Sequence, residues 1–208
     1  MCDEDRQPCK SCGASILPST AQKNDGECMP CRGGYRVSSI AEGKLRRKKE
    51  KERFDAPDAV FWRSLVTRVY DENLGFSSLT EPEKLFFALC LLEGEVYNGG
   101  IEQFFTNSSG DYYTFSVMGL EILNADVWLS LLLEAKHLLF GNQDVPTNTE
   151  MRRRILLRVD LDSDESEISR SLNNIDKRFY EELDLHTDTL GNLIRRFGIE
   201  QGFWNDLP

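Results

Sequence analysis

Two cysteine pairs near the N-terminus carry the most specific chemical pattern in this sequence. Cys9 and Cys12 form one C-x₂-C pair, Cys28 and Cys31 form a second, and fifteen residues separate the two pairs. This spacing is typical of a four-thiolate zinc site, in which each tight turn supplies two sulfurs to a tetrahedral ion. Because protein would fill all four positions, none would remain for water or substrate. We therefore expect one structural Zn²⁺ ion.

A disulfide is the alternative interpretation of the same cysteines. The preceding residues, Met1-Cys2-Asp3-Glu4-Asp5-Arg6, are not the apolar stretch of a secretory signal, and a reducing compartment keeps thiols free for metal. No apolar run reaches the roughly 18 residues needed to cross a bilayer. We therefore predict a zinc module, a cytoplasmic location and no membrane span.

Other residue types give little support for catalysis. The two histidines, His137 and His186, do not have the spacing of a metal hydrolase, and neither a G-x-S-x-G motif nor a phosphate-binding loop occurs. The sequence predicts that the protein is not an enzyme. An enzyme of uncharacterised activity is the alternative.

The distribution of charge divides the chain. Residues 1–53 contain twelve Lys or Arg and eight Asp or Glu, whereas residues 54–208 contain thirteen and twenty-seven, for a formal net charge of −10 overall. We predict a zinc-ribbon-like module over 1–38, a basic linker over 39–54, and an acidic helical domain over 55–208.

The linker contains the consecutive basic residues Arg46, Arg47, Lys48 and Lys49. A hydrophilic spacer, in the form of a solvated helix, explains them without a ligand. Alternatively, they contact phosphates beside the zinc module, which would make the protein a nucleic-acid-binding adaptor.

Beyond residue 54 apolar residues recur at helical spacing almost throughout, and no alternating strand pattern competes with them. A helix is expected to start near Pro57 and to continue to about Asn73. Thr80 and Glu83 form a capping box before a strongly apolar helix. Further helices are expected over 101–105, 112–123, 127–140, 149–159, 165–183 and 189–197. The fold class predicted is an all-α main domain, a compact multi-helix bundle.

The middle of this domain is an unusual polar corner over residues 95–111. Gly99 and Gly100 permit one sharp reversal, and residues 107–110 permit a second after a single short helix. We expect Asn98, Gln103 and Asn107 to satisfy backbone groups at the helix ends. A polar pocket that also includes Glu102 is the functional alternative.

Residues 96–110, which read VYNGGIEQFFTNSSG, and residues 119–125, which read GLEILNA, resemble the signature of a bacterial all-helical family, the DNA-mimic proteins. The resemblance covers about residues 57–200. It implies a helical, often dimeric domain whose acidic surface resembles duplex DNA and occupies a DNA-binding protein.

Rows of carboxylates are a plausible basis for such mimicry. Duplex DNA carries one phosphate per roughly 3.4 Å of axis on each strand, and carboxylates three or four residues apart on a helix lie about 5 to 6 Å apart. The partner, a basic or DNA-binding protein, is expected to contact Asp160, Asp162, Asp164, Glu165, Glu167, Glu181, Glu182, Asp184 and Asp188. A third acidic group is expected at Glu93, Glu95 and Glu102.

Overall fold

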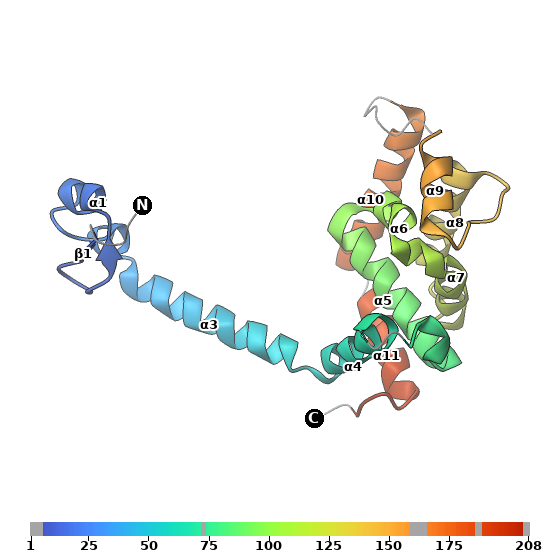
Figure 1. Cartoon of the computed structure of the whole chain (residues 1–208), viewed down its shortest axis with the longest axis horizontal. Coiled ribbons are helices and arrows are strands. Elements are labelled where there is room, and N and C mark those ends of the chain that lie inside the picture. The colour runs from blue at the N-terminus through green and yellow to red at the C-terminus, as the bar shows by residue number, and fades with distance from the viewer. Residues whose placement is uncertain (1–5, 72–73, 159–165, 186–188, 206–208) are drawn as a thin grey trace. The chain divides into compact units, whose positions relative to one another are not determined.

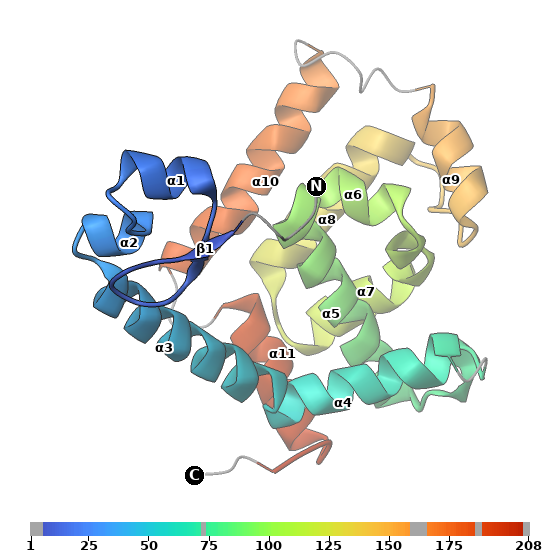
Figure 2. The same cartoon turned by 60° about the vertical axis from the view of Figure 1, so that its left-hand side comes forward.

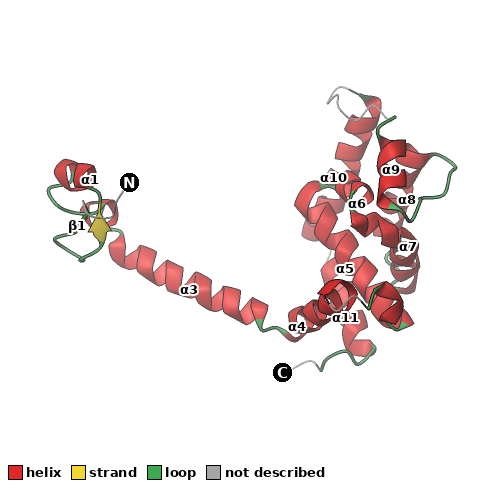
Figure 3. Cartoon of the chain, viewed as in Figure 1, coloured by secondary structure: helices red, strands yellow, loops and turns green. Residues whose placement is uncertain are grey.

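The chain forms two compact units, residues 1–56 and 57–208, which we call the cysteine unit and the helical unit. The computed structural model describes residues 6–71, 74–158, 166–185 and 189–205, with the backbone alone for 182–185. Figure 3 shows helices in both units, and the described strands belong to the cysteine unit. Within the described ranges, no helix is both long and apolar enough to cross a membrane.

The cysteine unit is built around a short hairpin. Strand β1 (Gln7–Pro8) pairs antiparallel with β2 (Ser15–Ile16), and helices α1 (Pro18–Lys23) and α2 (Met29–Arg32) follow. Its buried hydrophobic cluster consists of Cys9, Ile16, Ala21 and Cys28. A core of this size is too small to offset the conformational entropy that the segment loses on folding. The folded cysteine unit therefore requires another source of free energy.

Helix α3 (Arg36–Phe54) completes the cysteine unit and contains the whole predicted linker. It has no buried residue, and Figure 1 shows it leading away from the cysteine-bearing lobe. Two ion pairs at i,i+4 spacing lie along it, Arg46–Glu50 at 3.6 Å and Lys48–Glu52 at 3.7 Å. The basic segment is therefore a solvated helix stabilised by its own charge pattern.

The all-α prediction for the main domain is confirmed. Helix α5 packs against α4, α6, α7 and α11, while α8 packs against α7, α9 and α10 (Figure 2). The helices are α4 (Pro57–Val66), α5 (Glu81–Gly99), α6 (Ile101–Thr106), α7 (Tyr113–Ile122), α8 (Asp126–Phe140), α9 (Thr149–Leu156), α10 (Glu167–Leu185) and α11 (Leu190–Glu200).

Helix α5 is the centre of this unit because its sequence is apolar on nearly every side. Phe87, Leu89 and Leu92 are fully buried, as expected for a helix that neighbours surround. The predicted capping box is present, with the Thr80 N–H donating to the Glu83 carboxylate at 2.8 Å. Arg68 also donates to that carboxylate at 2.6 Å, which fixes the start of α5 against the preceding segment.

The helix expected from Pro57 to Asn73 is interrupted. Helix α4 ends at Val66, and residues Thr67–Asp71 form a π-helical turn. Within this turn Val69 is buried, while Arg68 reaches Glu83. A widened turn changes which residues face the core, and apolar periodicity alone does not signal it.

Candidate metal centre and acidic helical unit

The four predicted cysteines lie together. Their Sγ atoms are all within 4.8 Å of one another, and the Cys12 and Cys28 Sγ atoms are 3.7 Å apart. Sulfurs around a tetrahedral zinc ion, with Zn–S bonds of ~2.3 Å, are separated by about 3.8 Å. A disulfide would bring two sulfurs to about 2.05 Å, and all four cysteines are free. The arrangement fits a bound metal ion and excludes a disulfide among these residues.

The backbone of the cysteine unit supports this cluster. The Cys28 N–H donates to Cys9 Sγ at 3.2 Å, which lowers the pKa of Cys9 to about 6. The first C-x₂-C turn closes through the Gly13 N–H, which donates to the Cys9 carbonyl at 2.8 Å, with Gly13 at a φ of 71°. Burial raises the pKa of Cys31. A bound cation would favour the thiolate form of all four side chains.

The carboxylate of Glu95 links three side chains of the polar corner. It accepts hydrogen bonds from Gln103 Nε2 at 2.6 Å, Asn107 Nδ2 at 3.0 Å and Ser109 Oγ at 2.5 Å. The prediction that Glu95 belongs to an acidic surface row is wrong, because these contacts use its oxygens inside the unit. The Gln103 and Asn107 side chains, expected to satisfy backbone groups at helix ends, donate to this carboxylate.

Arg152, which sequence reasoning missed, satisfies the carbonyls at the end of α6. Its side chain is fully buried and donates to the Phe105 carbonyl at 2.9 Å and the Asn107 carbonyl at 2.6 Å. An ion pair with Asp111 at 2.6 Å balances its charge. The available signal was the spacing of Arg152 and Leu156, which places both on the buried side of α9.

Helix α10 fixes the other end of the corner. Asp176 Oδ1 accepts the Ile101 N–H at 2.7 Å, and the Tyr180 hydroxyl donates to the Val96 carbonyl at 2.7 Å. Gly100 has a φ of 87°, and a Cβ there would collide with the Asp176 carboxylate. The corner is thus a structural junction of α5, α6, α9 and α10.

The structure describes only part of the predicted partner-binding set. Glu167 and Glu181 are exposed on α10, and Glu181 pairs with Lys177 at 3.6 Å. The remaining predicted contacts lie outside the described residues. These are Asp160, Asp162, Asp164, Glu165 and Asp188, together with the side chains of Glu182 and Asp184.

The predicted phosphate contacts are exposed residues of α3. Arg46 and Lys49 line one side of the helix together with Arg53. Arg47 and Lys48 project in other directions, because consecutive helical residues are rotated by about 100°. The four residues therefore surround the helix and do not form one strip.

Together, the fold and its polar corner define an all-helical acidic unit joined to a separate cysteine module that can hold a metal ion. The family model described as DMP19-like protein matches residues 77–197, more than half of the chain. The chain belongs to this family, which confirms the resemblance to DNA-mimic proteins. No curated protein and no solved structure matches.

Proposed function

We propose that the helical unit acts as a DNA mimic, which binds the DNA-binding surface of a basic protein and blocks it without catalysing a reaction. Membership of the DMP19-like family carries the proposal. The charge of the unit supports it, since residues 57–208 contain twenty-six Asp or Glu and thirteen Lys or Arg. Such an excess attracts a cationic partner and releases counterions on binding.

The carboxylates most available to a partner are those that no cation of the protein already neutralises. Several exposed acids are paired, including Glu81 with Lys84, Glu134 with Arg178 and Glu150 with Arg154. Among the described residues of the helical unit, the exposed carboxylates without an ion pair are Asp71, Glu121, Asp126, Asp144, Glu167 and Glu200.

The cysteine unit has a structural role in this proposal. Cys9, Cys12, Cys28 and Cys31 would hold one Zn²⁺ ion, the metal that four thiolates in a tetrahedral arrangement favour. The ion would contribute folding free energy to a segment whose own core is four residues.

The test is capture of proteins by the tagged full chain from a nuclease-treated lysate of its own source, at low and moderate salt. The expected result is a DNA-binding protein that free duplex DNA displaces and that binds more weakly as salt rises. Reversing Asp162, Asp164, Glu181 and Glu182 to Lys should abolish capture. Neutralising the basic residues of α3 is the matched control and should leave capture intact.

Helix α3 favours a second candidate function, nucleic-acid binding by the cysteine unit. The helix contains eight Lys or Arg and three Asp or Glu, and none of its residues is buried. If changing Arg46, Arg47, Lys48 and Lys49 to Gln removes nucleic acid retained without nuclease, while the acidic reversal has no effect, this candidate replaces the first.

A further inference from the structure

Helix α10 lines an open groove on the helical unit, beside the polar corner. The lining residues recur at the spacing of one helix face, and they are Asn173, Asp176, Lys177, Tyr180 and Glu181. The groove has a volume of about 400 Å³, and its surface is mainly apolar. One face of α10 therefore presents an aromatic ring together with two carboxylates.

The ring of Tyr180 is held in a fixed position. Its hydroxyl donates to the Val96 carbonyl at 2.7 Å, and its ring stacks on that of Tyr97, with the centroids 5.7 Å apart and the planes at 28°. Tyr180 nevertheless remains 38% exposed. A fixed and partly exposed aromatic ring attracts a cation, because the face of its π-system is negative.

Asp176 contributes a carboxylate that no cation in the described part of the chain neutralises. Its Oδ1 atom accepts the Ile101 N–H at 2.7 Å, whereas Oδ2 accepts no hydrogen bond from any described residue. Burial raises the pKa of Asp176, because less water reaches its ionised form. A cation bound in the groove would compensate for that lost hydration.

The other charges around the groove mostly favour a cation as well. Glu181 pairs with Lys177 at 3.6 Å, but both side chains are exposed, so water and salt weaken the pair. The bond from Tyr180 to Val96 places the groove beside the last turn of α5, which contains no basic residue. A helix C-terminus carries partial negative charge. Lys177 is the one lining residue that opposes a cationic ligand.

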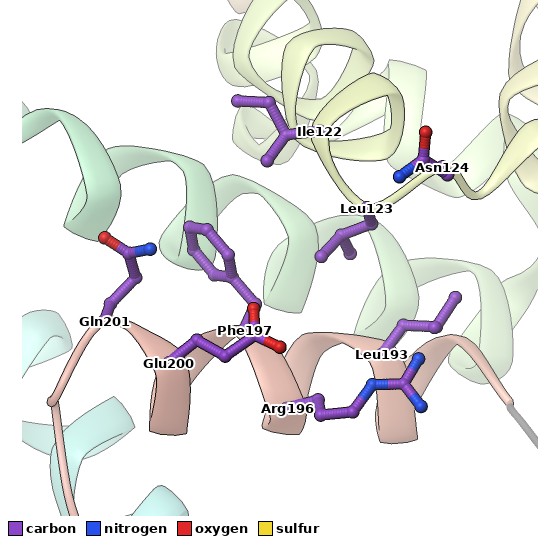
Figure 4. A pocket seen from close by; sticks show the side chains of 8 residues that line it. All are labelled: Ile122, Leu123, Asn124, Leu193, Arg196, Phe197, Glu200 and Gln201. Atoms are coloured by element: carbon purple, nitrogen blue, oxygen red, sulfur yellow. The ribbon is translucent and has the colours of Figure 1, made fainter.

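The pocket between the C-terminal end of α7 and helix α11 differs in its charge (Figure 4). Ile122 and Phe197 supply apolar surface there, and the charged lining residues are Arg196 and Glu200. One cation and one carboxylate balance, so the lining does not select a cationic ligand. The groove on α10 has two carboxylates and one cation, and the carboxylate of Asp176 is unpaired.

We propose that the groove on α10 binds the guanidinium group of an arginine from the partner protein, stacked on Tyr180 and bonded to Asp176. A guanidinium is planar, so it can stack on an aromatic ring while its N–H groups donate to a neighbouring carboxylate, whereas a lysine ammonium is a compact point charge. The inference rests on the proposed function, because DNA-binding proteins use arginine to contact phosphates and bases. The groove would supply a carboxylate where DNA supplies a phosphate.

The test uses two synthetic peptides of Gly, Ser and basic residues that are identical except that every basic residue is Arg in one and Lys in the other. Binding to the full chain is measured by calorimetry at low and moderate salt. We expect the Arg peptide to bind about fivefold more tightly, because stacking of a cation on a partly exposed ring is worth on the order of that factor. Both affinities should fall with salt while their ratio persists.

Substitutions in the groove assign this preference to Tyr180. Tyr180→Leu should remove the preference and Tyr180→Phe should keep it, because both lose the hydroxyl bond to Val96 and only Phe retains the ring. Asp176→Asn should weaken the Arg peptide more than the Lys peptide. Lys177→Gln should strengthen both, since it removes the opposing cation. Tyr70→Leu, at a tyrosine that is 46% exposed elsewhere in the helical unit, is the matched control and should change neither affinity.

Equal affinity of the two peptides for the unchanged protein overturns the inference, even if the capture experiment succeeds. An Arg preference that Tyr180→Leu leaves unreduced overturns it as well, because the guanidinium then binds elsewhere. Conversely, an Arg preference that depends on Tyr180, without any DNA-displaceable capture, contradicts the proposed function and leaves the groove as a guanidinium-binding site.

Discussion

Arg152 and Arg154 lie two residues apart on α9, but Arg152 is buried and Arg154 is exposed. Arg152 is fully buried and bonded to carbonyls of the corner, whereas the Arg154 side chain is 76% exposed and pairs with Glu150 at 3.8 Å. A buried cation whose partners are fixed is costly to remove, because those partners lose their hydrogen bonds. An exposed pair contributes little, because water and salt screen it.

Arg152→Met should therefore lower the free energy of unfolding by about 3 kcal/mol, since it removes the buried cation that pairs with Asp111 and donates to the Phe105 carbonyl. Denaturant unfolding monitored by circular dichroism measures the change. Arg154→Met is the matched control and should cost less than about 0.5 kcal/mol. Equal losses in the two variants would show that the Arg152 contacts do not support the fold.

The Glu93 carboxyl should make the stability of the helical unit depend on pH. Its side chain packs against Gly191 of α11, where a Cβ would lie 2.6 Å from Oε1, and burial raises its pKa. A carboxyl whose pKa is higher in the folded state opposes folding once it ionises. Its effect is absent below the ordinary glutamate pKa of 4.5 and grows as pH rises through the folded-state pKa.

Glu93→Gln should therefore gain stability relative to the unchanged protein as pH rises above 4.5, and the gain should level off above the folded-state pKa. Thermal unfolding across pH 4 to 8 measures the difference, with the exposed Glu121→Gln as the control for lost surface charge. A constant difference across this range would contradict the assignment.

At the scale of elements, the corner explains why this stretch of sequence is so distinctive. Glu95 of α5, Arg152 of α9 and Asp176 of α10 each bond to the short helix α6 or to the turn that follows it. Gln103 and Asn107, which look like parts of a polar site in the sequence, are partners in these contacts. The corner thus orients α9 and α10, the helices on either side of the predicted acidic segment at 160–165.

Glu95→Ala should lower the free energy of unfolding by about 2 to 4 kcal/mol, because three partly buried donors lose their acceptor. Glu181→Ala, which removes an exposed carboxylate paired with Lys177, is the control and should cost less than about 0.5 kcal/mol. Chemical denaturation of both variants provides the comparison. A small loss of stability in Glu95→Ala would show that the Glu95 carboxylate does not stabilise the corner.

At the scale of the whole molecule, the two units have separate cores. The four buried residues of the cysteine unit share no cluster with the core of the helical unit. All three tryptophans, Trp62, Trp128 and Trp204, belong to the helical unit. Tryptophan fluorescence therefore reports the helical unit, and metal content reports the cysteine unit.

Removing the metal with a chelator, or substituting Cys28→Ser, should unfold the cysteine unit and release about one equivalent of zinc. The midpoint of tryptophan-detected unfolding should stay the same, because the helical core gains nothing from the ion. Purified protein without metal would contradict the zinc proposal. A shifted tryptophan transition would instead show that the two units stabilise each other.

Four features could be predicted from the sequence alone, because local spacing encodes each of them: the cysteine cluster, the all-helical main domain, the solvated basic helix and the family. Cysteine separation defines a thiolate set, a period of 3.6 defines helices, and a run of charges leaves nothing to bury. The partner-binding carboxylates remain a prediction.

Which charges are buried and which are exposed became clear only from the folded structure. Glu95 and Arg152 look like surface residues in the sequence, yet their partners come from elements up to 47 residues away. The pocket at Ile122 and Phe197 likewise exists only where α7 meets α11. Burial and ion pairing depend on contacts between distant helices, and the spacing of residues along one helix does not contain that information.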